Sequence, residues 1–458
     1  MVSDGVVTAS SLIESSPSLH NNTIVCKFGG TSLADADQIR KSAKIVLADK
    51  DRRCIVVSAP GKRTSADKKI TDLLYLCHSL VKQGLNSAFA FDIIRDRYMG
   101  IADKLDVPEM FEWLRDIQVE IASGADNDWV ASRGEYLNAR LIAKFIGGTF
   151  VDAADLIVFG TEGRIRTSET YARIAAKLEN LQGIAVIPGF YGRDLAGKIR
   201  CFSRGGSDIT GAIVARAVYA KVYENWTDVS GLLMADPRLI ANPKPIAEVT
   251  YREQRELSYM GATVLHDEAV FPVREAGIPI HIKNTNDPSA PGTKIVTARD
   301  SSQSTIVGVA GQRGFVTIFT EKALMNSEIG YGRRMLELLE GRGIPYEHAP
   351  TSIDTMSVIV REDHLADREE QVVLDIKNIL KPDRIEVMHD LAMIATVGEG
   401  MSNKIGMAGK LFAALGDAGV NIRMIDQGAS EINIIIGVIG ADFEKAMQAI
   451  YSAFVDPA

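Results

Sequence analysis

Short apolar runs alternate with longer helical patterns from residue 23 to about residue 300. The short runs are rich in β-branched residues and end at turn formers, which predicts strands. The best candidates are 23–26, 54–58, 185–187, 221–226 and 280–282. The longer patterns predict helices at 35–48, 70–83, 87–98, 136–146, 167–181 and 208–220. Because the strands are apolar along their length, we expect a mostly parallel sheet flanked by helices, an α/β fold.

A different pattern begins after the turn-forming stretch 284–293, which predicts a domain boundary near residue 300. Beyond it the chain repeats itself, because Met325 and Gly330 recur as Met401 and Gly406 in similar surroundings. Each copy contains a strand, a turn, an amphipathic helix and further strands, which predicts two βαββ modules. The repeat alone is as compatible with packing units as with regulatory ones.

Composition and charge exclude several classes of function. The chain has 458 residues, of which 46% are hydrophobic and 24% charged, as in ordinary globular proteins. Its net charge of -8 leaves no basic excess for a phosphate backbone, so we expect no nucleic-acid partner. No apolar run approaches the ~20 residues of a membrane span, so no membrane is expected either.

The cysteines and the first residues of the chain bear on its location. The four cysteines are far apart and form no CxxC pair, which indicates neither a zinc site nor disulfides: Cys26, Cys54, Cys77 and Cys201. This favours a reducing compartment, and we expect a cytoplasmic protein. Residues 1–22 are rich in Ser and Asn and lack Lys and Arg, unlike a signal or transit peptide. They are predicted to form a flexible N-terminal segment.

The first candidate for chemistry is the motif KFGGTS at 27–32, directly after a predicted strand. Its two glycines let backbone amides approach a phosphate, and Lys27 supplies a positive charge. The motif matches neither the GxxxxGK[ST] nor the GxGxxG spacing. Taken alone, a strand followed by two glycines is more often a tight turn.

The second candidate is SRGGSD at 203–208, where a basic glycine-rich loop opens a helix. Amides at a helix N-terminus can hold an anion, and Arg204 can bind a carboxylate through two parallel hydrogen bonds. Asp208 can position nearby cations. The alternative is that Ser207 or Asp208 only caps the helix.

Two further motifs complete the set. The segment NWTDVSG at 225–231, followed by DPR at 236–238, ends a strand in a polar turn, where open α/β sheets bind ligands. Otherwise Trp226 belongs simply to the core. Glu135 in the motif SRGE can accept a substrate ammonium, although an isolated glutamate is more often solvated.

With these four motifs in this order, the chain resembles the aspartate kinases of the amino acid kinase family. The segment VIPGFYG at 186–192 also fits, and residues 305–458 resemble paired ACT domains, which bind an amino-acid effector. In that family the second ACT module is typically inserted into the first. The implied domains are a catalytic domain at 23–300 and ACT domains at 301–386 and 387–458, with the C-terminal strands available to complete the first ACT domain.

The resemblance implies that ATP phosphorylates the side-chain carboxylate of L-aspartate to 4-phospho-L-aspartate, the entry to lysine, methionine and threonine synthesis. A carboxylate is already ionised at pH 7, so no general base is needed. The obstacle is that one anion attacks another. Catalysis then comes from positioning and from cations and amide dipoles, with Mg²⁺ bridging the ATP phosphates and no metal site built from protein residues.

The resemblance also assigns roles to individual residues. Lys27 would stabilise charge on the transferred phosphoryl group, and Asp208 would orient the cationic groups. Glu135 would hold the substrate ammonium, while Arg204 and, more weakly, Thr71 would hold its α-carboxylate. The implied nucleotide contacts are Lys27, Gly29, Gly30, Gly205, Gly206, Thr227, Asp228 and Arg238. The implied effector contacts are Met325, Asn326, Glu347, Thr351 and Ser352.

One departure from the family pattern leaves alternatives open. Many relatives have GAKVLHP where this chain has GATVLHD, so Thr263 replaces a phosphate-contacting lysine. Lys244 is a possible substitute, or the chain belongs to a subgroup with other phosphate contacts. The competing functions are a catalytically silent amino-acid sensor and a kinase for another acid such as acetylglutamate. Lysine, threonine or both are candidate effectors, and a homodimer or homotetramer through the ACT domains is expected.

Overall fold

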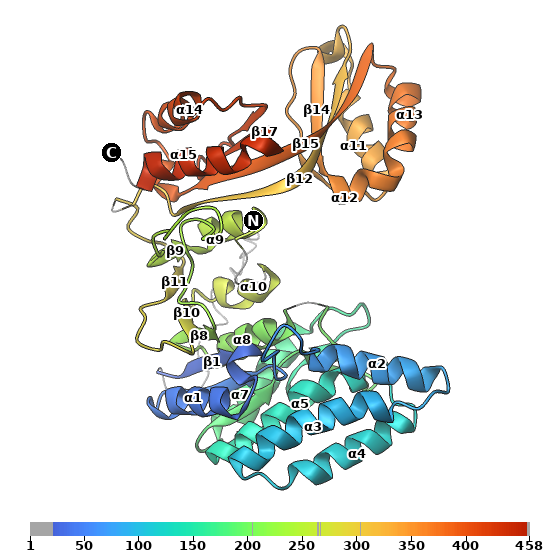
Figure 1. Cartoon of the computed structure of the whole chain (residues 1–458), viewed down its shortest axis with the longest axis vertical. Helices are drawn as coiled ribbons and strands as arrows, with labels where there is room; N and C mark the ends of the chain where they lie inside the picture. The colour runs from blue at the N-terminus through green and yellow to red at the C-terminus, as the bar shows by residue number, and fades with distance from the viewer. Residues whose placement is uncertain (1–21, 204, 263–264, 266, 303, 456–458) are drawn as a thin grey trace, which may run out of the picture. The chain divides into compact units, whose positions relative to one another are not determined.

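The computed structural model describes residues 22–203, 205–262, 265, 267–302 and 304–455. The chain divides into two compact units (Figure 1). The first unit comprises Met1–Ser230 and Leu265–Thr297, and the second comprises Gly231–Val264 and Ala298–Ala458. The domain boundaries expected from the sequence stay a prediction.

The main sheet of the first unit is mostly parallel, as predicted. Its strands follow the order β3-β5-β2-β1-β8-β10-β11. In chain order they are β1 (Ile24–Phe28), β2 (Arg52–Val57), β3 (Thr149–Phe150), β5 (Ala185–Pro188), β8 (Val222–Thr227), β10 (Ile280–Asn284) and β11 (Thr293–Val296). Only the pair of β10 and β11 is antiparallel among the described ladders of these strands. A small second sheet holds β4 (Val158–Phe159), β6 (Tyr191–Asp194) and β7 (Ile199–Cys201).

Helices flank this sheet, and one group of them lies side by side (Figure 1). This group comprises α2 (Ile70–Lys82), α3 (Ala88–Leu105), α4 (Met110–Ala122) and α5 (Asn127–Ile146). The others are α1 (Ala36–Leu47), α6 (Ala153–Leu156), α7 (Thr167–Glu179), α8 (Gly206–Ala217) and α10 (Asp267–Glu275). Two differences from the prediction stand out: α4 was not expected, and α5 begins at Asn127 rather than at residue 136.

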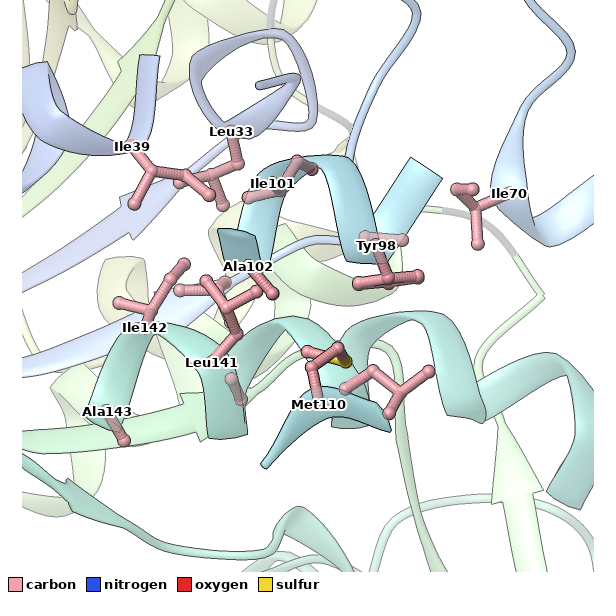
Figure 2. Packing of buried hydrophobic residues seen from close by; sticks show 14 of the residues in the cluster. Leu33, Ile39, Ile70, Tyr98, Ile101, Ala102, Met110, Leu141, Ile142 and Ala143 are labelled. Atoms are coloured by element: carbon pink, nitrogen blue, oxygen red, sulfur yellow. The ribbon is translucent and has the colours of Figure 1, made fainter. Parts of the chain in front are cut away.

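Side chains alternate between the two faces of the sheet along β1, which places Cys26 and Phe28 on one face and Lys27 on the other. Cys26 and Phe28 of β1 join a buried cluster with residues of α1, α2, α3, α4 and α5. Figure 2 shows part of this cluster, in which Tyr98 and Leu141 pack with side chains of neighbouring helices. Full burial of such a side chain stabilises the fold by roughly 1.5–3 kcal/mol. Lys27 lies between Cys26 and Phe28 and therefore faces the other side of the sheet.

The second unit contains one six-stranded sheet in the order β13-β14-β12-β15-β17-β16. Its strands are β12 (Gly308–Glu321), β13 (Tyr346–His348), β14 (Thr355–Arg361), β15 (Arg384–Val397), β16 (Met424–Asp426) and β17 (Asn433–Ile439). The two longest strands, β12 and β15, pair from Gly308 and Val397 at one end to Glu321 and Arg384 at the other. One end of this pair is extended by β14 and the other end by β17, so both modules share its two strands.

The repeat predicted from the sequence is confirmed in the helices of this unit. They are α11 (Tyr331–Gly341), α12 (Glu362–Leu365), α13 (Glu369–Leu380), α14 (Met407–Asp417) and α15 (Phe443–Val455). Gly330 precedes α11 with φ 83°, and Gly406 precedes α14 with φ 90°, a left-handed conformation that favours glycine. The fold is thus an α/β unit followed by two βαββ modules, as expected.

The segment 231–264 carries β9 (Glu248–Thr250) and α9 (Tyr251–Tyr259), and a buried ion pair is among the contacts that hold it in the second unit. Glu253 of α9 contacts Arg299 at 2.6 Å, and these side chains are 0% and 4% exposed. The same carboxylate accepts the backbone N–H of Glu399 at 2.7 Å. Glu253 therefore ties this excursion of the chain to the second βαββ module.

Candidate active site

Lys27 and Asp208 meet in space, although they are far apart in the chain. Lys27 lies on β1 and faces the side of the sheet that α8 covers, and Asp208 lies in the first turn of α8. The Lys27 Nζ to Asp208 Oδ1 distance is 2.5 Å, with 10% and 17% of these side chains exposed. The two glycine-containing motifs therefore converge on one partly buried ion pair.

Strand β8 supplies a third member of this group. Asn225 is the direct neighbour of Lys27 in the parallel pair of β1 and β8, so both side chains face α8. Asn225 is buried and its Nδ2 donates a hydrogen bond to Asp208 Oδ1 at 2.8 Å. The Tyr223 hydroxyl donates to the Asp208 carbonyl oxygen at 3.1 Å. Asp208 is thus held by both its side chain and its backbone.

A cavity of about 200 Å³ opens beside this group. Its lining residues are Lys27, Ser58, Thr71, Glu135, Phe190, Gly205, Gly206, Ser207 and Asp208. They combine one ammonium, two carboxylates, three hydroxyls and a glycine pair at a helix N-terminus. Such a set can hold an anionic group next to a polar substrate.

Glu135 is the most perturbed carboxyl group of this cavity. It lies on α5 and is buried, and this burial raises its pKa to about 7 even though backbone N–H groups of Ala59 and Glu135 itself favour the charged form. Its Oε2 has no hydrogen-bond partner among the described residues. A buried carboxylate oxygen without a partner is costly, so this atom is suited to a ligand cation such as an ammonium group.

The glycines matter for their lack of a side chain as well as for their backbone amides. A Cβ at Gly61 would lie 2.4 Å from the carbonyl carbon of Gly30, so the two loops can approach only without side chains. The Gly29 N–H donates to the Trp226 carbonyl at 3.0 Å, so this amide is engaged within the fold. Gly205 has φ 57°, in the left-handed region, and directly precedes α8.

The remaining predicted substrate and nucleotide residues are distributed more widely. Thr71 lines the cavity, as do Gly205 and Gly206. Thr227 and Asp228 lie at the carboxyl end of β8 and contact each other at 3.2 Å, but do not line this cavity. Arg204 and Thr263 lie outside the described residues.

Two predicted or proposed cations belong to the second unit. Arg238 pairs there with Asp236 at 2.6 Å, and this pair holds the pKa of the Asp236 carboxyl below its usual value. Lys244, the possible substitute for a lysine at residue 263, donates from Nζ to the Val455 carbonyl at 2.8 Å.

Four of the five predicted effector residues lie in two adjacent turns of the first βαββ module, and the fifth, Glu347, lies on a strand. Met325 is buried, and Asn326 donates its N–H to the Ile353 carbonyl at 3.0 Å. Thr351 and Ser352 are exposed and belong to the same loop as Ile353. Glu347 lies on β13, and partial burial raises its pKa.

Sequence reasoning missed part of the site. Ser58 and Phe190 line the cavity, but Ser58 belongs to no motif and Phe190 stands in the segment VIPGFYG, for which no binding role is predicted. Asn225 stands in the motif that predicts a ligand site at the end of this strand, but the motif does not predict its bond to Asp208. The available signal was the pair Glu224 and Asn225 inside an otherwise apolar strand, since buried polar residues require partners.

The described residues contain neither a metal-binding cluster nor a membrane-spanning helix. No group of three or more His, Cys, Asp or Glu side chains is arranged there to hold a metal ion. No helix in the described ranges has the length and apolarity needed to cross a membrane.

A parallel sheet with a lysine and an aspartate beside a glycine-rich helix N-terminus defines an α/β phosphotransferase of the amino acid kinase type. The amino acid kinase family model matches residues 22–284, and an ACT domain model matches residues 394–454. The chain belongs to the amino acid kinase family and, within it, to the aspartokinases.

The relatives that support this assignment cover almost the whole chain. Aspartokinase 3 of Bacillus subtilis (strain 168) is 41% identical over 446 residues, which are 94% of this chain and 98% of the relative. The crystal structure of Clostridium acetobutylicum aspartate kinase is 49% identical, with a TM-score of 0.92 over 94% of this chain and 100% of that one. Aspartokinase III of E. coli in complex with lysine and aspartate is 26% identical, with a TM-score of 0.75 over 95% and 100%.

Proposed function

We propose that the protein transfers the γ-phosphoryl group of ATP to the side-chain carboxylate of L-aspartate, the first step of lysine, methionine and threonine synthesis. The observation that carries this proposal is the cavity in which the Lys27 and Asp208 ion pair faces the buried carboxylate of Glu135. It offers a cation for a phosphoryl group and an anion for an ammonium group. No general base lies in the proposed mechanism, because the attacking carboxylate is already ionised.

In this reaction a bond forms between an aspartate carboxylate oxygen and the γ-phosphorus, and the bond from that phosphorus to ADP breaks. Negative charge builds on the transferred group, and the ammonium of Lys27 is placed to stabilise it. Asp208 keeps this ammonium oriented, and Asn225 in turn orients Asp208. Both are positioning groups rather than proton acceptors.

The substrate amino acid is proposed to bind at the other side of the same cavity. Its ammonium would contact Glu135 and restore the charged form of that carboxyl group, because an opposite charge lowers a raised carboxyl pKa. Thr71 and Arg204 would hold the α-carboxylate of the substrate. The lining hydroxyl of Ser58 is a further candidate donor.

The nucleotide is proposed to lie over the glycine motifs and the end of β8. Gly29, Gly30, Gly205 and Gly206 are the proposed phosphate contacts, and Thr227, Asp228 and Arg238 are the proposed contacts of the rest of ATP. The carboxylates among the described lining residues are Asp208, which binds Lys27, and Glu135, which is assigned to the ammonium. This donor set fits Mg²⁺ held mainly through the ATP phosphates, where it would neutralise phosphate charge.

Regulation is proposed to occur through the βαββ modules. An aspartokinase of E. coli is described in complex with lysine and aspartate, which supports lysine as an effector here. Its proposed contacts are Met325, Asn326, Glu347, Thr351 and Ser352, with threonine as the alternative effector. A homodimer or homotetramer through these modules and a cytoplasmic location, consistent with the four free cysteines, complete the proposal.

A hydroxamate assay tests the function directly. Purified protein, ATP, Mg²⁺, aspartate and hydroxylamine should yield aspartyl hydroxamate and ADP, whereas acetylglutamate in place of aspartate should not. Replacement Lys27→Ala should abolish turnover in a protein that still folds. Tight effector binding without any hydroxamate would instead favour a silent amino-acid sensor.

A further inference from the structure

The second unit contains a cavity of about 560 Å³ that no proposed role explains. It lies between the turn before α14, the end of α15, the segment before β12 and part of segment 231–264. No described residue of β16 or of the loop after it lines this cavity. None of the proposed effector residues of the first module lines it either.

The charged side chains among the described residues that line this cavity are all positive. Lys244, Lys404 and Lys410 line it, and none of its described lining residues is Asp or Glu, in a chain whose net charge is -8. Lys404 Nζ lies 2.7 Å from the Thr305 hydroxyl oxygen, and Lys410 Nζ lies 5.1 Å from the centre of the Phe454 ring. These two partners are uncharged, so they gather the ammonium groups without neutralising them.

The start of α14 adds to the same field. Gly406 and Met407 line the cavity, and α14 begins at Met407 after the left-handed Gly406. No side chain caps this helix, so its first-turn amides are not satisfied by a capping group. A helix N-terminus with free amides favours a negatively charged ligand.

The cavity lining also includes apolar side chains, and these favour an organic anion over an inorganic one. Met234, Ile306 and Phe454 contribute apolar surface beside the lysines. The volume is within the range of small-molecule sites. A bare inorganic ion would leave this apolar surface uncovered, whereas an organic anion would cover it.

We propose that this cavity binds a small organic anion with a phosphate or several carboxylate groups. Lys404, Lys410 and the first-turn amides of α14 hold the charged groups, and Phe454 and Met234 contact the body of the ligand. The site is separate from the proposed amino-acid effector loops and differs in the charge that it selects. It gives the second module a ligand of its own.

Titration calorimetry of the full chain without Mg²⁺ tests the proposal, with pyrophosphate and citrate as probes for the two kinds of charged group. The wild type should bind at least one probe in an event that the double variant Lys404→Gln/Lys410→Gln loses or weakens at least about tenfold. The probe affected identifies phosphate or carboxylate as the preferred group. Binding at the catalytic cavity remains in both proteins, so the difference between them reports on this site.

The control is Lys377→Gln, which removes an exposed lysine of α13 outside the cavity. It should bind both probes as the wild type does. The single variants Lys404→Gln and Lys410→Gln should each weaken the same event several-fold and keep aspartate-dependent ADP formation. Identical isotherms for the wild type and the double variant with both probes would overturn the proposal, as would an equal loss in the control.

Discussion

A single oxygen of Asp208 carries two contacts at the proposed reaction centre. Asp208 Oδ1 accepts from Lys27 at 2.5 Å and from Asn225 at 2.8 Å. A carboxylate fixed in this way holds the ammonium of Lys27 in one place, which matters because phosphoryl transfer depends on positioning. The neutral amide of Asn225 adds this restraint without adding charge.

Replacing Asn225 by Leu removes this donor at similar volume and should lower kcat by about tenfold or more, since hydrogen bonds to charged groups contribute about 1.5–3 kcal/mol. The KM for aspartate should change little, because the contacts of Glu135 and Thr71 are untouched. Steady-state kinetics with both substrates measure this split. An unchanged kcat would exclude Asn225 as a positioning residue. So would an equal loss of kcat/KM for aspartate and for ATP that follows from misfolding.

The raised pKa of Glu135 predicts a pH dependence of substrate capture. Its pKa is about 7 because the group is buried, so below pH 7 the free protein increasingly carries a neutral carboxyl that attracts an ammonium less. The kcat/KM for aspartate should therefore fall as pH decreases below about 7. Glu135→Gln should give a low and nearly flat profile over the same range, and a wild-type profile without this limb would contradict the assignment.

The same group should make folding less favourable at high pH. Its pKa is raised from 4.5 to about 7, so the unfolded chain ionises more easily and stability decreases as pH rises between these values. At pH 8, Glu135→Gln should resist urea better than the wild type, by up to about 3 kcal/mol, and the difference should shrink towards pH 4.5. Urea midpoints at both pH values measure this.

At the scale of elements, the excursion 231–264 depends on the pair of Glu253 and Arg299. Burial raises the pKa of Glu253, but the hydrogen bonds from Arg299 and backbone groups outweigh this and lower it. A carboxyl group whose pKa is lowered by folding stabilises the fold at pH values above its ordinary pKa of 4.5. This contribution is lost as the pH falls through the pKa of the folded state. The attachment of α9 should therefore weaken in acid.

Replacing Arg299 by Met should destabilise the second unit by about 3–5 kcal/mol, because a buried carboxylate is left without its partner. The additional change Glu253→Gln should recover part of this loss. Arg384→Gln is the matched control, because its ion pair with Glu386 is exposed and should contribute less than about 1 kcal/mol. Urea unfolding would contradict this account if both arginine variants lost the same stability.

Elements with strong local signals were predictable from the sequence, whereas those set by packing were not. Strand β1 and helix α8 were found because apolar periodicity and glycine turns mark them. The early start of α5 was missed because it places Gly134, a poor helix former, inside the helix. There a Cβ would lie 2.9 Å from the Ala59 Cβ, so close packing rather than propensity favours glycine.

The candidate site divides in the same way. Lys27, Glu135 and Asp208 stand in local motifs, so each could be identified from the sequence before the fold was available. Ser58 stands in no motif and Phe190 stands in a motif without an assigned role, so only the fold places both at the cavity. Asn225 required the register between β1 and β8, which no local pattern specifies.

At the scale of the whole second unit, one side-chain contact links the two βαββ modules. His348 of β13 contacts Asp426 of β16 through Nδ1 and Oδ2, although these strands are at opposite ends of the sheet order. His348 is the neighbour of Glu347, a proposed effector contact. The contact therefore connects the proposed effector loop with the second module.

Asp426→Asn should shift the inhibition curve for lysine to higher concentration, because it weakens the support of β13 beside the effector loop. Initial rates at increasing lysine measure the shift. Asp417→Asn changes an exposed residue at the end of α14 and is the control. Lysine should inhibit this variant as it inhibits the wild type. Coincident curves for all three proteins would show that this contact does not serve regulation.

The shared strands β12 and β15 have a consequence for how such a protein can diversify. Each is 14 residues long and contributes one half to each module. Deleting either module would leave half of both strands with unpaired backbone groups, exposed to association with other chains. Recombination therefore cannot exchange one module without disrupting the other. New effector preferences should arise by point substitutions in the loops, while the paired strands β12 and β15 are retained together.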